Sequence, residues 1–304
     1  MITSRVLMIR PHVFGFNEQT AVNNMFQAAP SDTDSAAKAL QEFDNFVAIL
    51  RSHGVIVDVV QDDPDPPTPD AIFPNNWFSL HENGQLFLYP MFAPNRRAER
   101  KPAVLTYLEK NFFCKSIIDL SYYEQQGLFL EGTGSMVLDH DAKIAFACLS
   151  PRTQATVLAD FCNQAGYTSC TFQAVDAAGH SFYHTNVMMT VTSKQVIVCM
   201  ESIVGAAEQE LVRSLITSSQ KELVQITLSQ VASFAGNLLE LKGKGHKPLL
   251  VMSTRAFQSL TTYQREQIGR WNDIIHCPLP TIESCGGGSA RCMLAEIRSA
   301  ERNM

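Results

Sequence analysis

The sequence ESCGGGSARCMLAEI, residues 283–297, is the stretch around which we interpret the whole chain. Its glycines at 286–288 lack a Cβ, so the backbone there can adopt positive φ and come close to a ligand or another strand. Cys292 follows in an apolar segment beside Arg291, and a neighbouring cation favours the thiolate that a nucleophilic cysteine must present. We therefore interpret Cys292 as a reactive thiol.

Other interpretations of this stretch are open from the residues alone. A buried cysteine beside a glycine turn is commonly a small core residue, and Cys285 is a rival thiol that precedes the glycines. Cys285 and Cys292 lie seven residues apart, whereas zinc-binding cysteine pairs are separated by about two to four residues. We therefore expect no metal site here.

Composition indicates a globular protein. The chain has 304 residues, of which 45% are hydrophobic and 18% charged, and no linker divides it, so we expect a single domain over residues 1–304. The net charge of −6 provides no basic stripe for a phosphate backbone, so we expect no nucleic-acid partner. The one basic cluster, at residues 96–101, is short and contains Glu99.

The chain shows no targeting or membrane signal. Residues 1–10 lack a long apolar core followed by small residues, so we expect no secretory signal there. No apolar run approaches the length of a membrane span. Eight scattered cysteines without a CxxC pair do not indicate a disulfide framework, and we expect a reducing cytoplasm.

Strand and helix patterns alternate along the chain roughly five times. A polar, proline-rich stretch at 61–69 predicts an irregular loop, which we consider as a lid. A hairpin turn is expected at 82–84. Strands are predicted at 4–9, 55–60, 86–89, 117–120, 143–149, 182–191, 195–200, 222–228, 238–241 and 248–252, and helices at 34–52, 97–112, 151–165, 205–217 and 255–270.

Several polar residues occur in apolar surroundings. Asn75 and Asn76 are adjacent amides in an aromatic, strand-like run, where each must find hydrogen-bond partners, although a plain turn after Pro74 would also explain them. Glu131 stands against a glycine turn, for which a surface hairpin is the simpler reading. Each of these observations is weak alone.

Two later segments carry further candidates. Arg152 falls in the first turn of the helix predicted at 151–165, where an anion would be favoured, although it also fits a solvated surface charge. His184 and Asn186 fall on one face of the strand predicted at 182–191, because side chains alternate along a strand. A lone histidine in that place is most often structural.

Taken in order, these motifs resemble the guanidino-group-modifying (pentein) superfamily, which includes arginine deiminases, dimethylarginine dimethylaminohydrolases and amidinotransferases. The resemblance covers nearly the whole chain. It implies an α/β fold, a five-bladed pseudo-symmetric α/β propeller, with the active site at the central channel. On the runs at 73–77 and 284–292 the sequence is most similar to the citrulline-utilisation hydrolase group.

The resemblance also implies roles for individual residues. Cys292 would be the nucleophile, His184 the acid and base, and Glu131 the carboxylate that orients the histidine and contacts a substrate nitrogen. Arg152 matches the arginine that binds a substrate α-carboxylate, with Arg97 as a second candidate. No metal or organic cofactor is implied, and we keep a homodimer open.

The departures from the family pattern concern the substrate. In the deiminases two aspartates hold the cationic guanidinium, whereas this chain has Asn76, or Asn75 in the alternative register, and Asn186. A carboxamide can donate to a ureido oxygen and accept from a ureido N–H, whereas an ionised carboxylate only accepts. We therefore expect a neutral ureido amino acid as substrate, with citrulline first, giving ornithine, ammonia and carbon dioxide.

Two competing functions follow. A deiminase, methylarginine hydrolase or amidinotransferase would need an anion for the guanidinium, which Glu131 or Asp70 could supply. A non-catalytic binding module of the same fold is the other alternative, against which the joint presence of Cys292, His184 and Glu131 argues.

Overall fold

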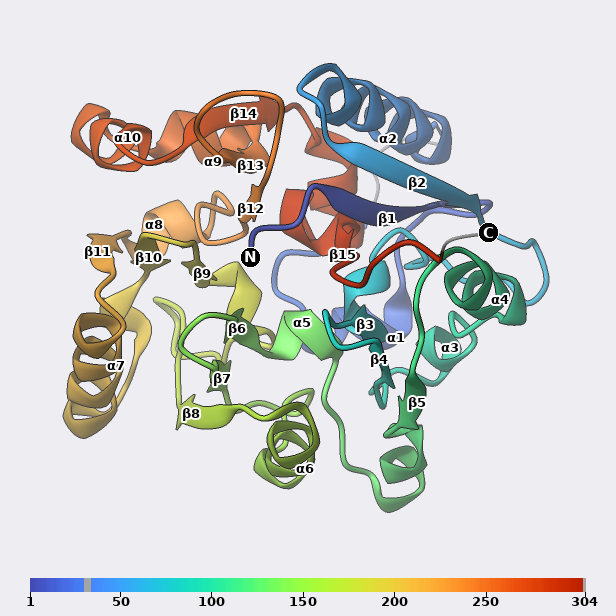
Figure 1. Ribbon diagram of the computed structural model, residues 1–304, viewed down its shortest axis with the longest axis horizontal. Helices are drawn as coiled ribbons and strands as arrows, with labels where there is room; N and C mark the ends of the chain where they lie inside the picture. The colour runs from blue at the N-terminus through green and yellow to red at the C-terminus, as the bar shows by residue number, and fades with distance from the viewer. Residues whose placement is uncertain (30–33, 303–304) are drawn as a thin grey trace.

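The computed structural model describes residues 1–29 and 34–302. In that part of the chain fifteen strands form five three-stranded sheets arranged in a ring (Figure 1). In each sheet the middle strand runs antiparallel to the first-named strand and parallel to the last. The sheets are β15(Ala295–Glu296)–β1(Arg5–Arg10)–β2(Ile56–Gln61), β3(Phe78–Leu80)–β4(Gln85–Leu88)–β5(Ser116–Asp119), β6(Val137–Asp139)–β7(Ile144–Cys148)–β8(Thr168–Phe172), β9(Met189–Val191)–β10(Gln195–Val198)–β11(Glu222–Gln225) and β12(Leu239–Leu241)–β13(Leu249–Ser253)–β14(Asp273–Cys277).

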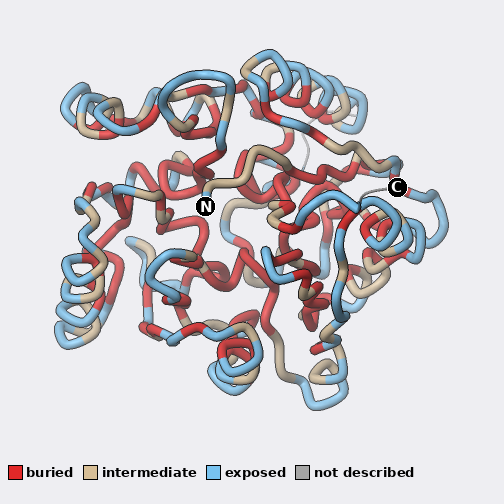
Figure 2. Tube along the Cα trace, in the orientation of Figure 1, coloured by how far each residue is buried: buried red, intermediate tan, exposed pale blue. Residues whose placement is uncertain are grey.

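Helices connect the parallel strands and lie around the outside of the ring (Figure 1). Parallel neighbours need a crossover, which a helix provides. The outer faces of these helices are exposed, whereas the strands toward the centre are mostly buried (Figure 2). This arrangement confirms the five-bladed α/β propeller. The connecting helices are α2(Ser35–Ser52), α3(Pro94–Arg97) with α4(Pro102–Asn111), α6(Ala155–Ala165), α7(Ala206–Ser218), and α9(Thr254–Ser259) with α10(Thr262–Gly269).

The ring is closed by the two ends of the chain. Strand β15 pairs with β1, in the register Val6 opposite Glu296 and Leu7 opposite Ala295. Because β15 comes from the C-terminal region and β1 from the N-terminal region, one sheet is assembled from both. The closure places the glycine-rich stretch before β15 at the middle of the ring.

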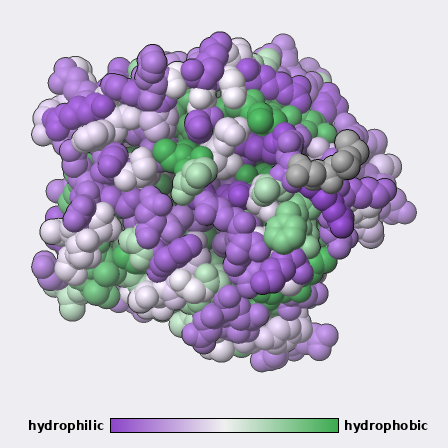
Figure 3. Space-filling model, viewed as in Figure 1, coloured by the Kyte–Doolittle hydropathy of each residue, from purple (hydrophilic) through white to green (hydrophobic). Residues whose placement is uncertain are grey.

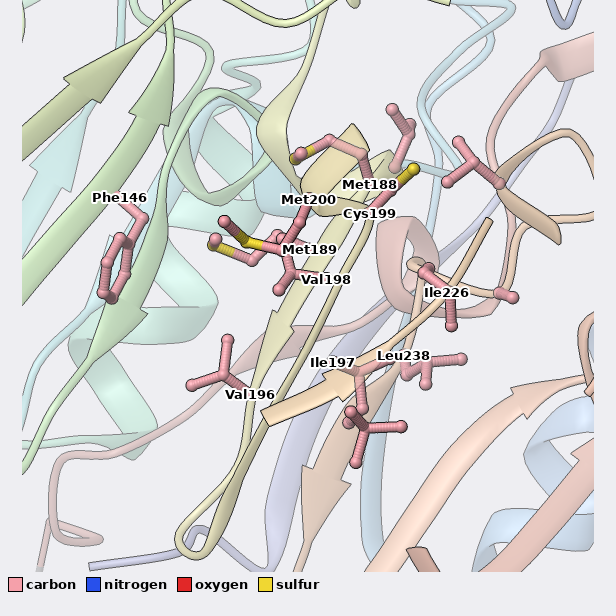
Figure 4. Packing of buried hydrophobic residues seen from close by; sticks show 14 of the residues in the cluster. Phe146, Met188, Met189, Val196, Ile197, Val198, Cys199, Met200, Ile226 and Leu238 are labelled. Atoms are coloured by element: carbon pink, nitrogen blue, oxygen red, sulfur yellow. The ribbon is translucent and has the colours of Figure 1, made fainter. Parts of the chain in front are cut away.

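Apolar packing between neighbouring sheets stabilises the ring. Val196, Ile197 and Val198 in β10 are all fully buried, so this strand has apolar neighbours on both faces, as in other doubly covered strands. Figure 4 shows them among Met188, Met189 and other apolar side chains of the same cluster. Met is unbranched and adapts to the irregular space where sheets meet.

The outer surface is largely polar. The face seen in Figure 3 is mainly hydrophilic, and its apolar residues form separated patches. No helix in the part of the chain that the structure describes is long and apolar enough to cross a membrane.

Short turns precede the first strand of each sheet and meet near the centre. They are η1(Pro74–Asn76), α5(Gly132–Ser135), η3(Thr185–Val187), residues 235–237 and η6(Ala290–Met293). Their backbones are very close, because a Cβ on Gly132 would lie 2.4 Å from Asn75 O and one on Gly236 would lie 2.4 Å from Val187 O. Glycine is therefore required where the turns meet.

The expected elements are largely present, with four corrections. The helix expected at 97–112 is divided, because Pro102 begins α4 as its first residue. The helix expected at 255–270 is divided at Thr261, which caps α10 through a capping box with Gln264.

The other two corrections affect candidate site residues. The helix expected at 151–165 begins only at Ala155, so Arg152 lies in a turn and not at a helix N-terminus. Residues 182–191 are not one strand: His184 precedes the 3₁₀ turn η3, which contains Asn186, and β9 begins at Met189. Alternation along a strand therefore does not explain why these two residues lie close to the centre.

We predict that Gly236→Ala destabilises the fold by about 1–3 kcal/mol, because the added methyl overlaps Val187 O in a close-packed centre. Gly269→Ala is the matched control, since a Cβ there meets nothing within 4 Å. Urea unfolding of both variants measures the difference. Equal stability of the two would contradict the proposed close packing of the turns.

Candidate active site

A small cavity lies where the central turns meet. Its walls come from residues far apart in the sequence. They are Thr20, Asn24, Asp70, Phe73, Asn76, Arg96, Arg152, Tyr183, His184, the glycines at 286–288 and Cys292. The ring closure therefore brings five of the predicted site residues to one cavity: Asp70, Asn76, Arg152, His184 and Cys292.

Cys292 lies in η6 and is 3% exposed. Two side-chain amides point at its sulfur: Asn237 Nδ2 is 3.2 Å and Asn186 Nδ2 is 3.5 Å from Sγ. Such donors bond best to an anionic acceptor. Arg291, the cation expected to favour the thiolate, instead bonds Leu294 O and pairs with Glu296.

The glycine-rich loop forms one wall of the cavity. Gly286 and Gly288 pack on the ring of Phe73, where an added Cβ would lie 2.8 Å from ring carbons. Gly287 has a φ of +64° and its carbonyl accepts from Tyr183 OH at 2.6 Å. The loop is therefore held from two sides, and Cys292 follows it directly.

His184 and Glu131 form a buried pair. His184 Nε2 is 2.8 Å from Glu131 Oε2, and Glu131 Oε1 accepts from Phe92 N at 3.0 Å. Burial lowers the pKa of His184 to about 4, although Glu131 opposes the shift. Burial alone would raise the pKa of Glu131, but Arg152, His184 and Arg96 outweigh it and lower that pKa. A neutral imidazole therefore faces an ionised carboxylate.

Arg152 is buried against the same carboxylate. Its Nη1 is 3.5 Å from Glu131 Oε2, and its guanidinium lies 4.8 Å from the centre of the Tyr183 ring. Its other donors bond Thr20 O and Asn23 Oδ1. Apart from Glu131 at the edge of bonding distance, these partners are uncharged.

The second arginine of the cavity is Arg96 and not Arg97. Arg96 is 2% exposed and forms a two-fold bonded pair with Glu99, with distances of 2.8 and 3.0 Å. Arg97 is directed elsewhere: it bonds Met91 O and pairs with Glu124 at 3.6 Å. The alternative assignment of Arg97 to a substrate carboxylate therefore has no geometric support.

The amide of Asn76 has a defined orientation. Arg96 Nη1 donates to Asn76 Oδ1 at 2.9 Å, and because arginine has no acceptor, the atom it contacts must be oxygen. Asn76 Nδ2 is then buried without a partner. Asn75 bonds Thr133 and does not line the cavity, so of the two neighbouring amides only Asn76 faces it.

Asn186 lies beside the sulfur and offers an acceptor. Its Oδ1 is buried without a partner. The residue also borders a larger cavity on the other side of the centre, together with Arg291 and Glu296. Ten buried side-chain atoms of the described residues have no partner, and of these Asn76 Nδ2 and Asp70 Oδ1 belong to residues that line the small cavity, where a ligand would complete them.

Asp70 ends the loop that follows β2. Burial raises its pKa, against the effect of Arg96 at 3.8 Å and of Asn17, which donates to Oδ2 at 2.7 Å. Its Oδ1 has no partner. The preceding loop is held by Lys101, which bonds Asp62 Oδ1 at 2.8 Å.

The segment around α1(Glu18–Ala21), at residues 17–28, covers the cavity. Besides the contacts of Asn17 and Thr20, Gln27 Nε2 donates to Cys285 O at 3.1 Å and Phe26 packs on Tyr183. This segment, and not the loop at 61–69, supplies cavity walls.

Sequence reasoning missed Asn237, the role of Arg96 and this covering segment. A Gly-Asn pair before a predicted strand was a visible signal for Asn237, since Asn75, Asn76 and Asn186 also precede strands. For residues 17–28 the sequence contains no comparable signal.

The comparisons with known proteins identify the family of the chain. The sequence profile of the family described as "N,N dimethylarginine dimethylhydrolase, eukaryotic" matches residues 10–299. The chain belongs to this family. It is therefore a member of the guanidino-group-modifying superfamily, as its motifs indicated. A comparison with curated protein sequences gives no match.

Several solved structures share the fold of this chain. The N-terminal domain of ArgZ, a cyanobacterial arginine dihydrolase, crystallised with substrate as a cysteine-to-serine mutant, has a TM-score of 0.76 at 15% identity, covering 97% of this chain and 98% of that one. A dimethylarginine dimethylaminohydrolase adduct with S-methyl-L-thiocitrulline has a TM-score of 0.63 at 13% identity, covering 98% and 100%. AgrE with ornithine and NAD+ has a TM-score of 0.74 at 17% identity, and the match covers 98% of this chain but 40% of AgrE.

Two further features bear on cofactors and thiols. Among residues 1–29 and 34–302, no group of three or more histidine, cysteine, aspartate or glutamate side chains is placed to hold a metal ion. All eight cysteines lie in these ranges as free thiols.

We predict that His184 stays neutral in the unliganded protein down to about pH 5, since its pKa is lowered to about 4. The folded state then binds fewer protons than the unfolded state between pH 4 and 6.5. This contribution to stability is complete above pH 6.5 and is lost as the pH falls through 4. Long-range ¹H–¹⁵N NMR of the imidazole measures the protonation state of His184 as a function of pH.

The Glu131→Gln variant is the control, because removing the carboxylate should lower the pKa of His184 further. An imidazolium signal for His184 at pH 6 in the wild type would refute the prediction.

Proposed function

We propose that the protein hydrolyses a neutral ureido amino acid through a covalent cysteine intermediate, with L-citrulline as the first candidate. The observation that carries the proposal is the orientation of Asn76. Arg96 holds its oxygen, so the amide offers the cavity an N–H donor. A ureido oxygen can accept that hydrogen bond, whereas a guanidinium has only donors.

The other free group supports the same substrate. Asn186 donates to the sulfur through Nδ2 and leaves Oδ1 as a free acceptor, although the residue borders the larger cavity and not the small one. Both asparagines are neutral amides, which suit a neutral ureido group that carries donors and an acceptor. Neither asparagine supplies the negative charge that would offset the desolvation of a buried guanidinium.

The proposed reaction proceeds in two steps. The sulfur of Cys292 attacks the ureido carbon, and neutral His184 accepts the thiol proton and gives it to the departing nitrogen, while Glu131 stabilises the imidazolium. Cleavage of one C–N bond leaves a thiocarbamate on Cys292. Water then attacks the thiocarbamate and releases the sulfur as a thiol together with a carbamic acid. The carbamic acid loses carbon dioxide, which breaks the second C–N bond and frees the second amine, so that citrulline and water give ornithine, ammonia and carbon dioxide.

Arg152 is the best candidate for the substrate carboxylate. The donor fork of Arg96 is occupied by Glu99, whereas most partners of Arg152 are neutral oxygens that a carboxylate can replace. Exchange of neutral acceptors for an anion strengthens the hydrogen bonds of a guanidinium.

We predict that the purified protein forms ornithine and ammonia from L-citrulline, and that Cys292→Ala abolishes this activity, because no other thiol lines the cavity among the described residues. Cys285→Ala is the matched control, since Cys285 is also buried in this stretch. Amino-acid analysis measures ornithine, with L-arginine assayed in parallel. Turnover of arginine without citrulline would exclude the proposed substrate.

We predict that Asn76→Asp lowers kcat/KM for citrulline roughly ten- to hundredfold, because loss of a donor and gain of a buried charge costs about 1–3 kcal/mol. The ratio of citrulline to arginine turnover should fall with it. Asn75→Asp is the matched control, because Asn75 does not line the cavity. A larger effect at residue 75 than at 76 would contradict the assigned geometry.

A second candidate is hydrolysis of a guanidino substrate such as arginine or dimethylarginine. One observation favours it: Asp70 borders the cavity and its Oδ1 has no partner. The family description and the arginine dihydrolase ArgZ point to such substrates. The parallel arginine assay, extended to dimethylarginine, separates the two candidates.

A further inference from the structure

We propose that Asn237 is a positioning residue for Cys292, whose side-chain amide holds the sulfur at the end of the cavity and stabilises its thiolate. The inference rests on the proposed role of Cys292 as the nucleophile, but not on the identity of the substrate. Asn237 is fully buried, and it does not itself line the cavity. It therefore acts on the reaction through the sulfur.

The side chain of Asn237 is held on three sides. Its Oδ1 accepts from Arg291 N at 3.0 Å, and its Nδ2 donates to Asn186 O at 3.0 Å and to Cys292 Sγ at 3.2 Å. It thus connects the turn before β9, the turn before β12 and η6. A shift of any of these turns would move the sulfur.

These contacts determine which atom faces the sulfur. A backbone N–H only donates, so the atom bonded to Arg291 N must be the amide oxygen. The –NH₂ group is then the one directed at Cys292 Sγ and Asn186 O. The backbone is equally constrained, because residue 236 must be glycine to pass Val187 O.

The arrangement gives the sulfur a donor that is present before substrate arrives. Asn186 also donates to the sulfur, at the longer distance of 3.5 Å, and its free oxygen is available to a ligand. Asn186 therefore also has an atom free for a ligand, whereas both polar side-chain atoms of Asn237 are bonded within the protein. Donors that are already oriented toward a charge stabilise that charge more than donors that must first reorient.

The test measures thiol reactivity and not turnover. The rate of iodoacetamide alkylation at residue 292 is followed from pH 6 to 10 by mass spectrometry in the wild type, Asn237→Ala, Asn237→Asp and Asn272→Ala. Asn272 is the matched control: it is 1% exposed and donates to Glu240 at 2.7 Å, away from the sulfur. Asn237→Asp retains the acceptor for Arg291 N but replaces the donor.

We expect both Asn237 variants to alkylate roughly tenfold more slowly than the wild type at pH 7, because a hydrogen bond to a charged group is lost. Asn272→Ala should follow the wild type. Folded Asn237 variants with a wild-type profile would overturn the proposal.

A second measurement uses the unaltered side chain, in case the variants do not fold. The Asn237 –NH₂ signals in a ¹H–¹⁵N spectrum should titrate with the same midpoint as the alkylation of Cys292, and Cys292→Ala should remove that titration. Signals that do not titrate would overturn the proposal. If the Asn237 variants alkylate more slowly but the wild type does not turn over citrulline, the proposed substrate is refuted and the role of Asn237 stands.

Discussion

The pairing of β15 with β1 is the constraint on which the rest of the structure depends. Only two residue pairs form this ladder, Val6 with Glu296 and Leu7 with Ala295. Neighbouring contacts reinforce it: Thr3 Oγ1 donates to Ile297 O at 2.6 Å, and Arg298 pairs with Glu82 at 2.9 Å. Since η6 directly precedes β15, the same pairing sets the position of Cys292.

The centre of the ring contains more charge than a hydrophobic core tolerates without pairing. Two arginines and three carboxylates are buried there, and each arginine has an acidic neighbour: Arg96 has Glu99 and Arg152 has Glu131. Burial of single ions would be costly, whereas bonded pairs are retained. The pairs also direct neutral neighbours, because Arg96 orients Asn76 and Glu131 orients His184. The geometry around a substrate is thus an outcome of charge compensation.

Sequence reasoning predicted the repeated strand and helix pattern because hydrophobic periodicity is local, and the motif order added the five-fold arrangement. It failed where long-range contacts decide. His184 and Asn186 were expected on one strand, but His184 precedes a 3₁₀ turn and Asn186 lies within it. Arg97 was expected as a second candidate for binding the substrate carboxylate, whereas its neighbour Arg96 is the buried arginine. Asn237 contacts residues 51 and 55 positions away, and although the Gly-Asn pair marks the residue, it does not indicate these partners. The start of the helix was predicted at Pro151, four residues before its observed start at Ala155, because proline suits a turn as well as the first turn of a helix.

The closed ring has a consequence for how the chain could be connected. Each sheet repeats the same strand order, and the first sheet combines β1 from the N-terminal region with β15 from the C-terminal region, where Arg298 donates to Met1 O. The site depends on which turns meet at the centre and not on where the polypeptide starts. A linker long enough to join the two terminal regions, with a new opening at the hairpin around Gly84, would leave every central turn in its sheet. A circular permutant built in this way would preserve the arrangement of the cavity residues.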